Sequence, residues 1–130
     1  MIRFNTHSID SVLSLVDLKP FIKKRPRVNI GNSEQLVHLD SQRLQLFKLK
    51  GIKCVVCGIE GSFFAEETHI GGNHPHLNLY AFNENGEDVL MTKDHIIPKS
   101  KGGKDHINNM QTMCYYCNQK KGDTVLWLKV

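Results

Sequence analysis

Two copies of the pattern Cys-x-x-Cys contain all four cysteines of this 130-residue chain and constrain its fold more than any other feature. The pairs are Cys54 with Cys57 and Cys114 with Cys117. Two such knuckles supply four thiolates, the ligand set of a tetrahedral structural Zn²⁺ site. A short chain buries only a modest core, so a metal that joins distant segments would help it fold. We therefore predict one structural zinc ion bound by these four cysteines. The alternative is a thiol redox protein, whose cysteines cycle instead of holding a metal.

The charge of the chain is compatible with a polyanionic partner, and its hydropathy argues against a membrane-spanning segment. The formal net charge is +4 and the pI is about 8.9, which suits a polyanionic partner, although many basic proteins never bind nucleic acid. No apolar run approaches the length of a membrane span. The first residues lack the charged-then-apolar layout of a signal peptide. We predict no membrane association and a cytoplasmic location, where disulfides are disfavoured and paired cysteines indicate a metal site.

The first 50 residues are predicted to form two helices and a hairpin. Apolar spacing predicts a short helix over residues 8–18 and a second helix over residues 41–50, which Gly51 ends. Between them, residues 28–39 have the pattern of a β-hairpin with a turn at Gly31. The basic residues 19–27 are interpreted as a solvated stretch, with a DNA-binding arm as the alternative.

The remaining residues alternate between strand patterns and loop patterns. The turn at Asn85-Gly86 predicts a β-hairpin, because this dipeptide favours the tight turn that joins two antiparallel strands. Residues 69–75 are rich in Gly, Asn and His and are predicted to form a loop. We interpret His69, His74 and His76 as exposed, with a second metal site as the alternative. The other expected elements are a strand at 61–65, hairpin strands at 77–81 and 89–93, a strand within 108–113, a helix at 115–121 and an apolar tail at 125–130 that packs back on the core.

Three polar residues at the end of this segment have the side chains of a metal-dependent hydrolytic site. Asp94 offers a hard oxygen ligand of the kind that Mg²⁺ prefers, and Asn118 offers a second oxygen. His95 is a base that works near neutral pH. Adjacent side chains on a strand point to opposite faces. Asp94 and His95 therefore converge only if the strand ends or twists there, and the loop that begins at Pro98 permits this.

Three stretches carry a family resemblance: DHIIPKSKGG at 94–103, NMQ at 109–111 and CYYCNQKKG at 114–122. Together with the first cysteine pair they resemble the HNH endonuclease family, across residues 54–122. The three residues that give the family its name correspond here to His95, Asn109 and Asn118, since the third position accepts His or Asn. A long insert between Cys57 and Asp94, with its own hairpin, departs from the family pattern, and nothing in the sequence assigns it a function.

The resemblance implies a role for each matching residue. Asp94 and Asn118 would hold a catalytic Mg²⁺ or Mn²⁺ in a ββα-metal fold. His95 would be the general base that activates water, and Asn109 would fix the loop that carries His95. The four cysteines would hold the structural zinc beneath the site. Hydrolysis of this kind leaves 5′-phosphate and 3′-hydroxyl ends.

We thus predict an α+β protein in which a zinc-stapled ββα-metal HNH nuclease unit follows an N-terminal helix and β-hairpin. Residues 1–50 would form the extension and residues 51–130 the nuclease domain, or the two would form one compact unit. Double-stranded DNA is the expected substrate, with phosphate contacts from Lys99, Lys101 and Lys121. The alternative is a catalytically silent zinc module that binds nucleic acid or protein. The biological setting, the target sequence, nicking against double-strand cutting and the oligomeric state stay open.

Overall fold

The computed structural model describes residues 1–18, 26–72 and 74–126, and within them one antiparallel sheet carries the fold. The strand order is β1-β2-β3-β4-β5, so each strand pairs with its neighbour in the sequence. The predicted α+β class is confirmed. The elements are β1 (Ile2–His7), α1 (Ile9–Leu13), α2 (Gln42–Lys50), β2 (Phe63–Thr68), β3 (His76–Phe82), β4 (Asp88–His95), β5 (Met110–Cys114) and α3 (Tyr115–Lys121), with short 3-10 turns η1 (Lys99–Lys101) and η2 (Ile107–Asn109).

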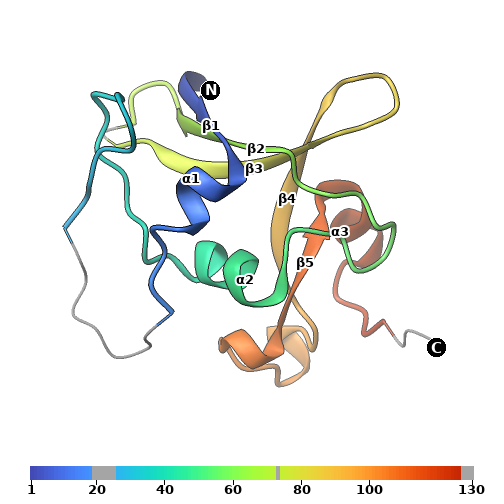
Figure 1. Ribbon diagram of the computed structural model, residues 1–130. Helices are drawn as coiled ribbons and strands as arrows, with labels where there is room; N and C mark the ends of the chain where they lie inside the picture. The colour runs from blue at the N-terminus through green and yellow to red at the C-terminus, as the bar shows by residue number, and fades with distance from the viewer. Residues whose placement is uncertain (19–25, 73, 127–130) are drawn as a thin grey trace.

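One face of the sheet forms the hydrophobic core against α1 and α2. In Figure 1, α1 lies in front of β3 and α2 lies below it. Alternate residues of a strand point to the same face, so Phe64 of β2 and Leu79 of β3 are fully buried on this side. The ring of Phe47 from α2 packs 6.3 Å from that of Phe64. Burial of these side chains fixes the register of the sheet, because a slip of one residue would expose them.

The N-terminal predictions hold for the helices and less well for the hairpin. The side chain of Ser41 caps α2 by accepting from Leu44 N, and Gly51 ends it at φ 98°, as expected. The helix expected at 8–18 is shorter, since α1 covers only Ile9–Leu13. The expected hairpin is a single bridge between Val28 and Val37. Between the two bridged residues, Ser33 N donates to Ile30 O and closes a local turn. The backbone there does not continue the pairing into a regular two-stranded ladder.

Strand β1 was not predicted and pairs with β2. Five of its six residues are exposed, so the short alternation of Ile2 and Phe4 with Arg3 and Asn5 does not mark a buried face. Its partner β2 comes from the long insert between Cys57 and Asp94, which also supplies β3 and residues 88–93 of β4. The insert therefore builds most of the sheet. The division of the chain at residue 50 stays a prediction.

Strand β4 changes partner along its length, and its last two residues, Asp94 and His95, are paired with β5. Its first residues, 88–90, pair with β3, and residues 91–95 pair with β5. In Figure 1 this strand runs from the β3–β4 turn down to the loop of residues 96–109, beyond which β5 and α3 follow. The β4–β5 hairpin and α3 together form a ββα unit.

The basic stretch 19–25 and the tail 127–130 lie outside the described residues, so the predictions made for them are not addressed. Within the described ranges, no helix is long and apolar enough to cross a membrane.

Candidate metal centre and active site

The four cysteines form one cluster. Their Sγ atoms all lie within 4.8 Å of one another, and Cys57 Sγ is 3.8 Å from Cys114 Sγ. None of the four is in a disulfide. Four thiolates at Zn–S distances of about 2.3 Å in a tetrahedron would be roughly 3.8 Å apart, so the cluster has the dimensions of a zinc site. The cysteines can hold a metal ion such as zinc.

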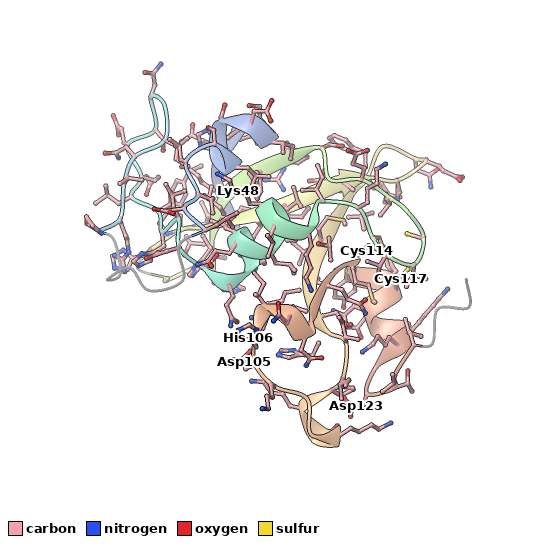
Figure 2. The ribbon with its side chains drawn as sticks, turned by 60° about the horizontal axis from the view of Figure 1, so that its bottom comes forward. Lys48, Asp105, His106, Cys114, Cys117 and Asp123 are labelled. Carbon is pink, nitrogen blue, oxygen red and sulfur yellow. The ribbon has the colours of Figure 1, made fainter. Side chains whose placement is uncertain are left out.

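Backbone hydrogen bonds bring the two knuckles together. Cys54 N donates to Ile59 O at 2.9 Å, which closes the first knuckle, and Val55 N donates to Thr112 O at 3.0 Å, which ties it to β5. Cys114 ends β5 and caps α3, because its sulfur accepts from Cys117 N at 3.5 Å. Figure 2 shows Cys114 and Cys117 at the start of α3, with the first knuckle beside them.

The thiols differ in acidity. Burial raises the pKa of Cys54, but hydrogen bonds from the backbone N–H groups of Cys114, Cys57 and Val56 outweigh burial and lower this pKa to about 7. Burial and hydrogen bonds with the other cysteines raise the pKa of Cys117. The thiol of Cys54 in the first knuckle is thus more acidic than that of Cys117 in the second.

A separate pocket of about 320 Å³ opens where β4 ends, and it contains the predicted catalytic residues Asp94, His95 and Asn118. Asp94 and His95 converge on it although they are neighbours on a strand, because β4 ends at His95 and the chain turns at the next residues. Figure 2 shows Asp123, which follows α3, at this lower end of the molecule, away from the cysteines. The other residues that line the pocket are Lys93, Pro98, Lys99, Ser100, Lys121, Gly122 and Asp123.

Asp94 is buried and both of its carboxylate oxygens are engaged. Gln111 Nε2 donates to Oδ2 at 3.0 Å. Lys121 Nζ lies 3.3 Å from Oδ1 and 3.2 Å from Oδ2, and it also donates to His95 O at 2.9 Å. This lysine is buried with its ammonium directed at Asp94. An ion bound to Asp94 would have to share the carboxylate with Lys121 or displace it.

His95 has a partner that sequence reasoning missed. Its Nε2 lies 3.1 Å from Asp105 Oδ1, and Asp105 also faces Lys99 at 3.8 Å. The hydrogen bond with His95 lowers the pKa of Asp105, so this carboxyl is charged at neutral pH. Asp105 belongs to none of the matching motifs, and only the folding of the 96–109 loop brings it to His95. Figure 2 shows it beside His106 on that loop.

Asn109 closes the same loop with both ends of its side-chain amide. Its Oδ1 accepts from Ile97 N at 2.9 Å, and its Nδ2 donates to Ile97 O at 3.0 Å and to Lys104 O at 2.9 Å. The loop passes so close here that a side chain at Gly103 would overlap the Ile97 carbonyl. The preceding Gly102 has a φ of 87°, which favours glycine. Asn109 lies outside the catalytic pocket and lines a neighbouring one.

The remaining predicted residues are distributed around the pocket. Asn118 Nδ2 donates to Thr92 Oγ1 at 2.8 Å, which orients its amide on α3 beside β4. Lys99 lines the pocket and is exposed, and Lys101 is exposed on the same 3-10 turn outside it. Asp123 adds a second carboxylate to the pocket, which sequence reasoning had not singled out.

Comparison with known families identifies this region. Residues 83–126, about a third of the chain, match the family model described as HNH endonuclease. The resemblance inferred from the motifs is confirmed, and the match indicates a nuclease-type domain, with nucleic-acid binding implied in general. No curated protein and no solved structure matches the chain.

Proposed function

We propose that this protein is a metal-dependent endonuclease that hydrolyses phosphodiester bonds of DNA. The proposed substrate is double-stranded DNA. His95 is the general base, and Asp94 and Asn118 hold the divalent ion. The single observation that carries the proposal is that these three side chains line one pocket of about 320 Å³ within the segment that matches HNH endonucleases.

The contacts of His95 suggest which ring nitrogen takes the proton. A carboxylate only accepts hydrogen bonds, so Asp105 favours the tautomer in which Nε2 carries hydrogen and donates to it. Nδ1 is then left with a free lone pair that removes a proton from water. The hydroxide formed attacks the phosphorus in line, and the bond to the 3′-oxygen breaks. The leaving oxygen takes up a proton from solvent and becomes the 3′-hydroxyl end. Asn109 keeps the loop with Asp105 in place through its bonds to Ile97 and Lys104.

The donor set of the pocket suits a hard divalent cation such as Mg²⁺ or Mn²⁺. Asp94 and Asp123 provide carboxylate oxygens and Asn118 an amide oxygen. When bound, such an ion would neutralise the charge that develops on the phosphate and on the leaving oxygen. Lys99 lines the pocket and Lys101 lies outside it on the same exposed turn, and both contact backbone phosphates in this proposal. Lys121 remains a proposed contact even though its ammonium faces Asp94.

The cysteine cluster is assigned a structural Zn²⁺ ion in the same proposal. It ties the first knuckle to the start of α3, and α3 carries Asn118 and Lys121. Zinc therefore fixes the position of the helix without entering the chemistry. Four thiols without a disulfide suit a reducing compartment, so a cytoplasmic location belongs to the proposal.

One observation favours the second candidate, a catalytically silent zinc module that binds nucleic acid or protein. Lys121 already neutralises Asp94 in a pair whose side chains are only 1% and 7% exposed. A carboxylate with a built-in cation does not need a divalent ion to be stable. This reading predicts nucleic-acid binding or protein binding without hydrolysis.

Cleavage of supercoiled plasmid separates the two candidates. We expect nicked or linear product with Mg²⁺ or Mn²⁺ and none with EDTA. His95→Ala should abolish the product while zinc content and the circular dichroism spectrum stay unchanged, because only the base is lost. Equal cutting by His95→Ala would refute the general-base assignment. Binding of plasmid by the wild type without any cutting in either metal would favour the silent module.

A further inference from the structure

A second pocket, of about 440 Å³, opens on the face of the sheet that α1 and α2 do not cover. Glu67, Asn78 and Tyr80 line it, and by strand alternation they point away from the core residues next to them. Apart from Leu90, the pocket is built by residues outside the segment that matches HNH endonucleases. It therefore belongs to the insert and the N-terminal residues.

One of the residues that line this pocket is a partly buried cation, Arg43. Arg43 reaches the pocket from α2, and its Nη2 donates to Leu77 O at 2.9 Å and to Asn78 Oδ1 at 3.0 Å. Its Nε is buried without a hydrogen-bond partner, and no ion pair joins Arg43 to a carboxylate of the described residues. Burial lowers the pKa of Arg43. A partly buried guanidinium with an unpartnered Nε and no counter-charge is costly, and an anion in the pocket would offset that cost.

Other basic side chains surround the same opening. His76 lines the pocket, and after burial the charges of Arg43, His38, His69 and Arg27 all act to lower its pKa. Arg27 Nε donates to His38 Nε2 at 3.0 Å, so these two residues form a connected basic pair. Five basic side chains thus lie near one another on this side of the molecule.

Acidic side chains in and around the pocket already have partners. Glu67 and Asp88 bind Arg3, at 2.8 Å and 3.0 Å. Asp40 faces His38 at 3.8 Å. None of these carboxylates neutralises Arg43, so the charge that an incoming ligand meets there is positive.

This pocket and the catalytic pocket border the same strand, β4. Leu90 borders the first and Asp94 the second. Both residues are on the face of β4 opposite to the core residues Val89 and Met91, four positions apart, or roughly 13 Å along the strand. That separation exceeds the roughly 3.4 Å between successive phosphates along the axis of one strand, so the two pockets would meet different phosphates of one duplex.

We propose that Arg43 and His76 form a phosphate-binding subsite for the nucleic-acid backbone, several nucleotides from the scissile bond. Its use by nucleic acid rests on the proposed endonuclease function, while the presence of an anion site does not. Arg43 provides the charge, and the imidazole of His76 donates a hydrogen bond at the mouth. The insert that departs from the family pattern thereby extends the surface with which the ββα unit contacts the nucleic-acid backbone.

The first test measures binding of a labelled DNA duplex to the full chain without Mg²⁺, across a range of salt concentrations. Arg43→Gln should weaken binding about 10-fold at low salt and reduce the slope of log Kd against log salt by about 1, as expected for one lost phosphate contact. The control Lys53→Gln removes the same charge from an exposed residue that lines neither pocket, and should leave the slope unchanged. His76→Ala should also weaken binding. Because His76 is exposed, this variant still tests the subsite if Arg43→Gln fails to fold.

The second test uses inorganic phosphate and does not depend on DNA binding. The ring proton signals of His76 should shift on titration of the wild type and stay fixed in Arg43→Gln. Absence of that shift would overturn the anion site. A phosphate-dependent shift together with an unchanged salt slope in Arg43→Gln would overturn its assignment to nucleic acid. A wild type that binds phosphate here but no DNA at all would instead refute the proposed endonuclease function and leave the anion site standing.

Discussion

Lys121 of α3 binds two consecutive residues of β4, with its Nζ 3.2 Å from Asp94 Oδ2 and 2.9 Å from the carbonyl oxygen of His95. One buried ammonium therefore fixes the side chain of the proposed metal ligand and the backbone of the proposed base. It also links the helix of the ββα unit to the strand that carries the chemistry. This contact makes the stability of the pocket dependent on charge pairing.

Removal of this ammonium should destabilise the protein. We expect Lys121→Met to lower the free energy of unfolding by about 3 kcal/mol, because Asp94 is left buried without its counter-charge. Lys120→Met, at the exposed neighbouring position, should change it by less than about 0.5 kcal/mol. Urea denaturation measures both values. The double variant Asp94→Asn with Lys121→Met should cost less than the two single changes added together, and strict additivity would show that the pair is not coupled.

The zinc prediction concerns folding. Purified protein should contain about one zinc ion per chain, and its removal by a chelator should abolish cooperative unfolding, because Cys114 both ends β5 and caps α3. Elemental analysis and thermal denaturation followed by circular dichroism measure the two effects. A reducing agent alone should change neither. Metal-free protein with disulfides and an unchanged Tm would support the thiol redox alternative.

The contact between Asp105 and His95 predicts a positioning role. Asp105→Asn should reduce the single-turnover cleavage rate roughly 10- to 100-fold, because an amide holds the imidazole less firmly in its productive tautomer and orientation. The Mg²⁺ concentration for half-maximal rate should not move, since Asp105 holds no metal in the proposal. Asp10→Asn, at an exposed position on α1, serves as the control. A change in metal requirement without a change in maximal rate would contradict the assignment.

Glu67 predicts part of the acid sensitivity. Burial raises its pKa, but hydrogen bonds from Tyr80, Asn78 and Arg3 outweigh burial and lower it. Because the folded-state pKa is below the unfolded value of about 4.3, its stabilising effect is present above that pH and is lost as the pH falls through the folded-state pKa. Glu67→Gln should therefore lose less stability than the wild type between pH 5 and pH 3. Urea midpoints at both values test this, with exposed Glu84→Gln as the control.

The sequence predicted well those elements whose signals are local. The Asn85-Gly86 turn predicted the β3–β4 hairpin, and the apolar spacing of residues 41–50 with Gly51 at their end predicted α2. The cysteine cluster followed from spacing alone, because thiols in this arrangement have few uses besides metal binding. Each of these features is determined by residues close together in the chain or by side chains with one dominant chemistry.

Features that depend on distant contacts were not predicted. Strand β1 exists because β2 offers an edge to pair with, and its own residues are mostly exposed. The partnership of Asp105 with His95 depends on a loop path that Asn109 and Gly103 determine together. The inward direction of Lys121 was hidden because a lysine after a metal-ligand motif suits phosphate binding equally well. In each case the tertiary contacts determine the structure, and the sequence alone is compatible with more than one interpretation.

The last prediction separates the two asparagines of the proposed site. Asn109 accepts from Ile97 N and donates to Ile97 O and Lys104 O, so it uses donor and acceptor together. Histidine does not reproduce this amide geometry. Asn109→His should therefore lose cleavage as completely as Asn109→Ala, and added metal should not restore it, because the loop with Asp105 is misplaced.

Asn118 is expected to behave in the opposite way. Its Nδ2 is held by Thr92 at 2.8 Å, and in the proposal its side-chain oxygen is a metal ligand. Asn118→Ala should raise the metal concentration needed for cleavage, and high Mn²⁺ should rescue much of the rate. Asn118→His should keep measurable activity with a shift in preference from Mg²⁺ towards Mn²⁺, since imidazole nitrogen binds the softer ion better. Plasmid cleavage titrated against each metal for all four variants provides the measurement. Because only a missing ligand is compensated by more metal, rescue of Asn109→Ala with no rescue of Asn118→Ala would mean that the two roles are reversed.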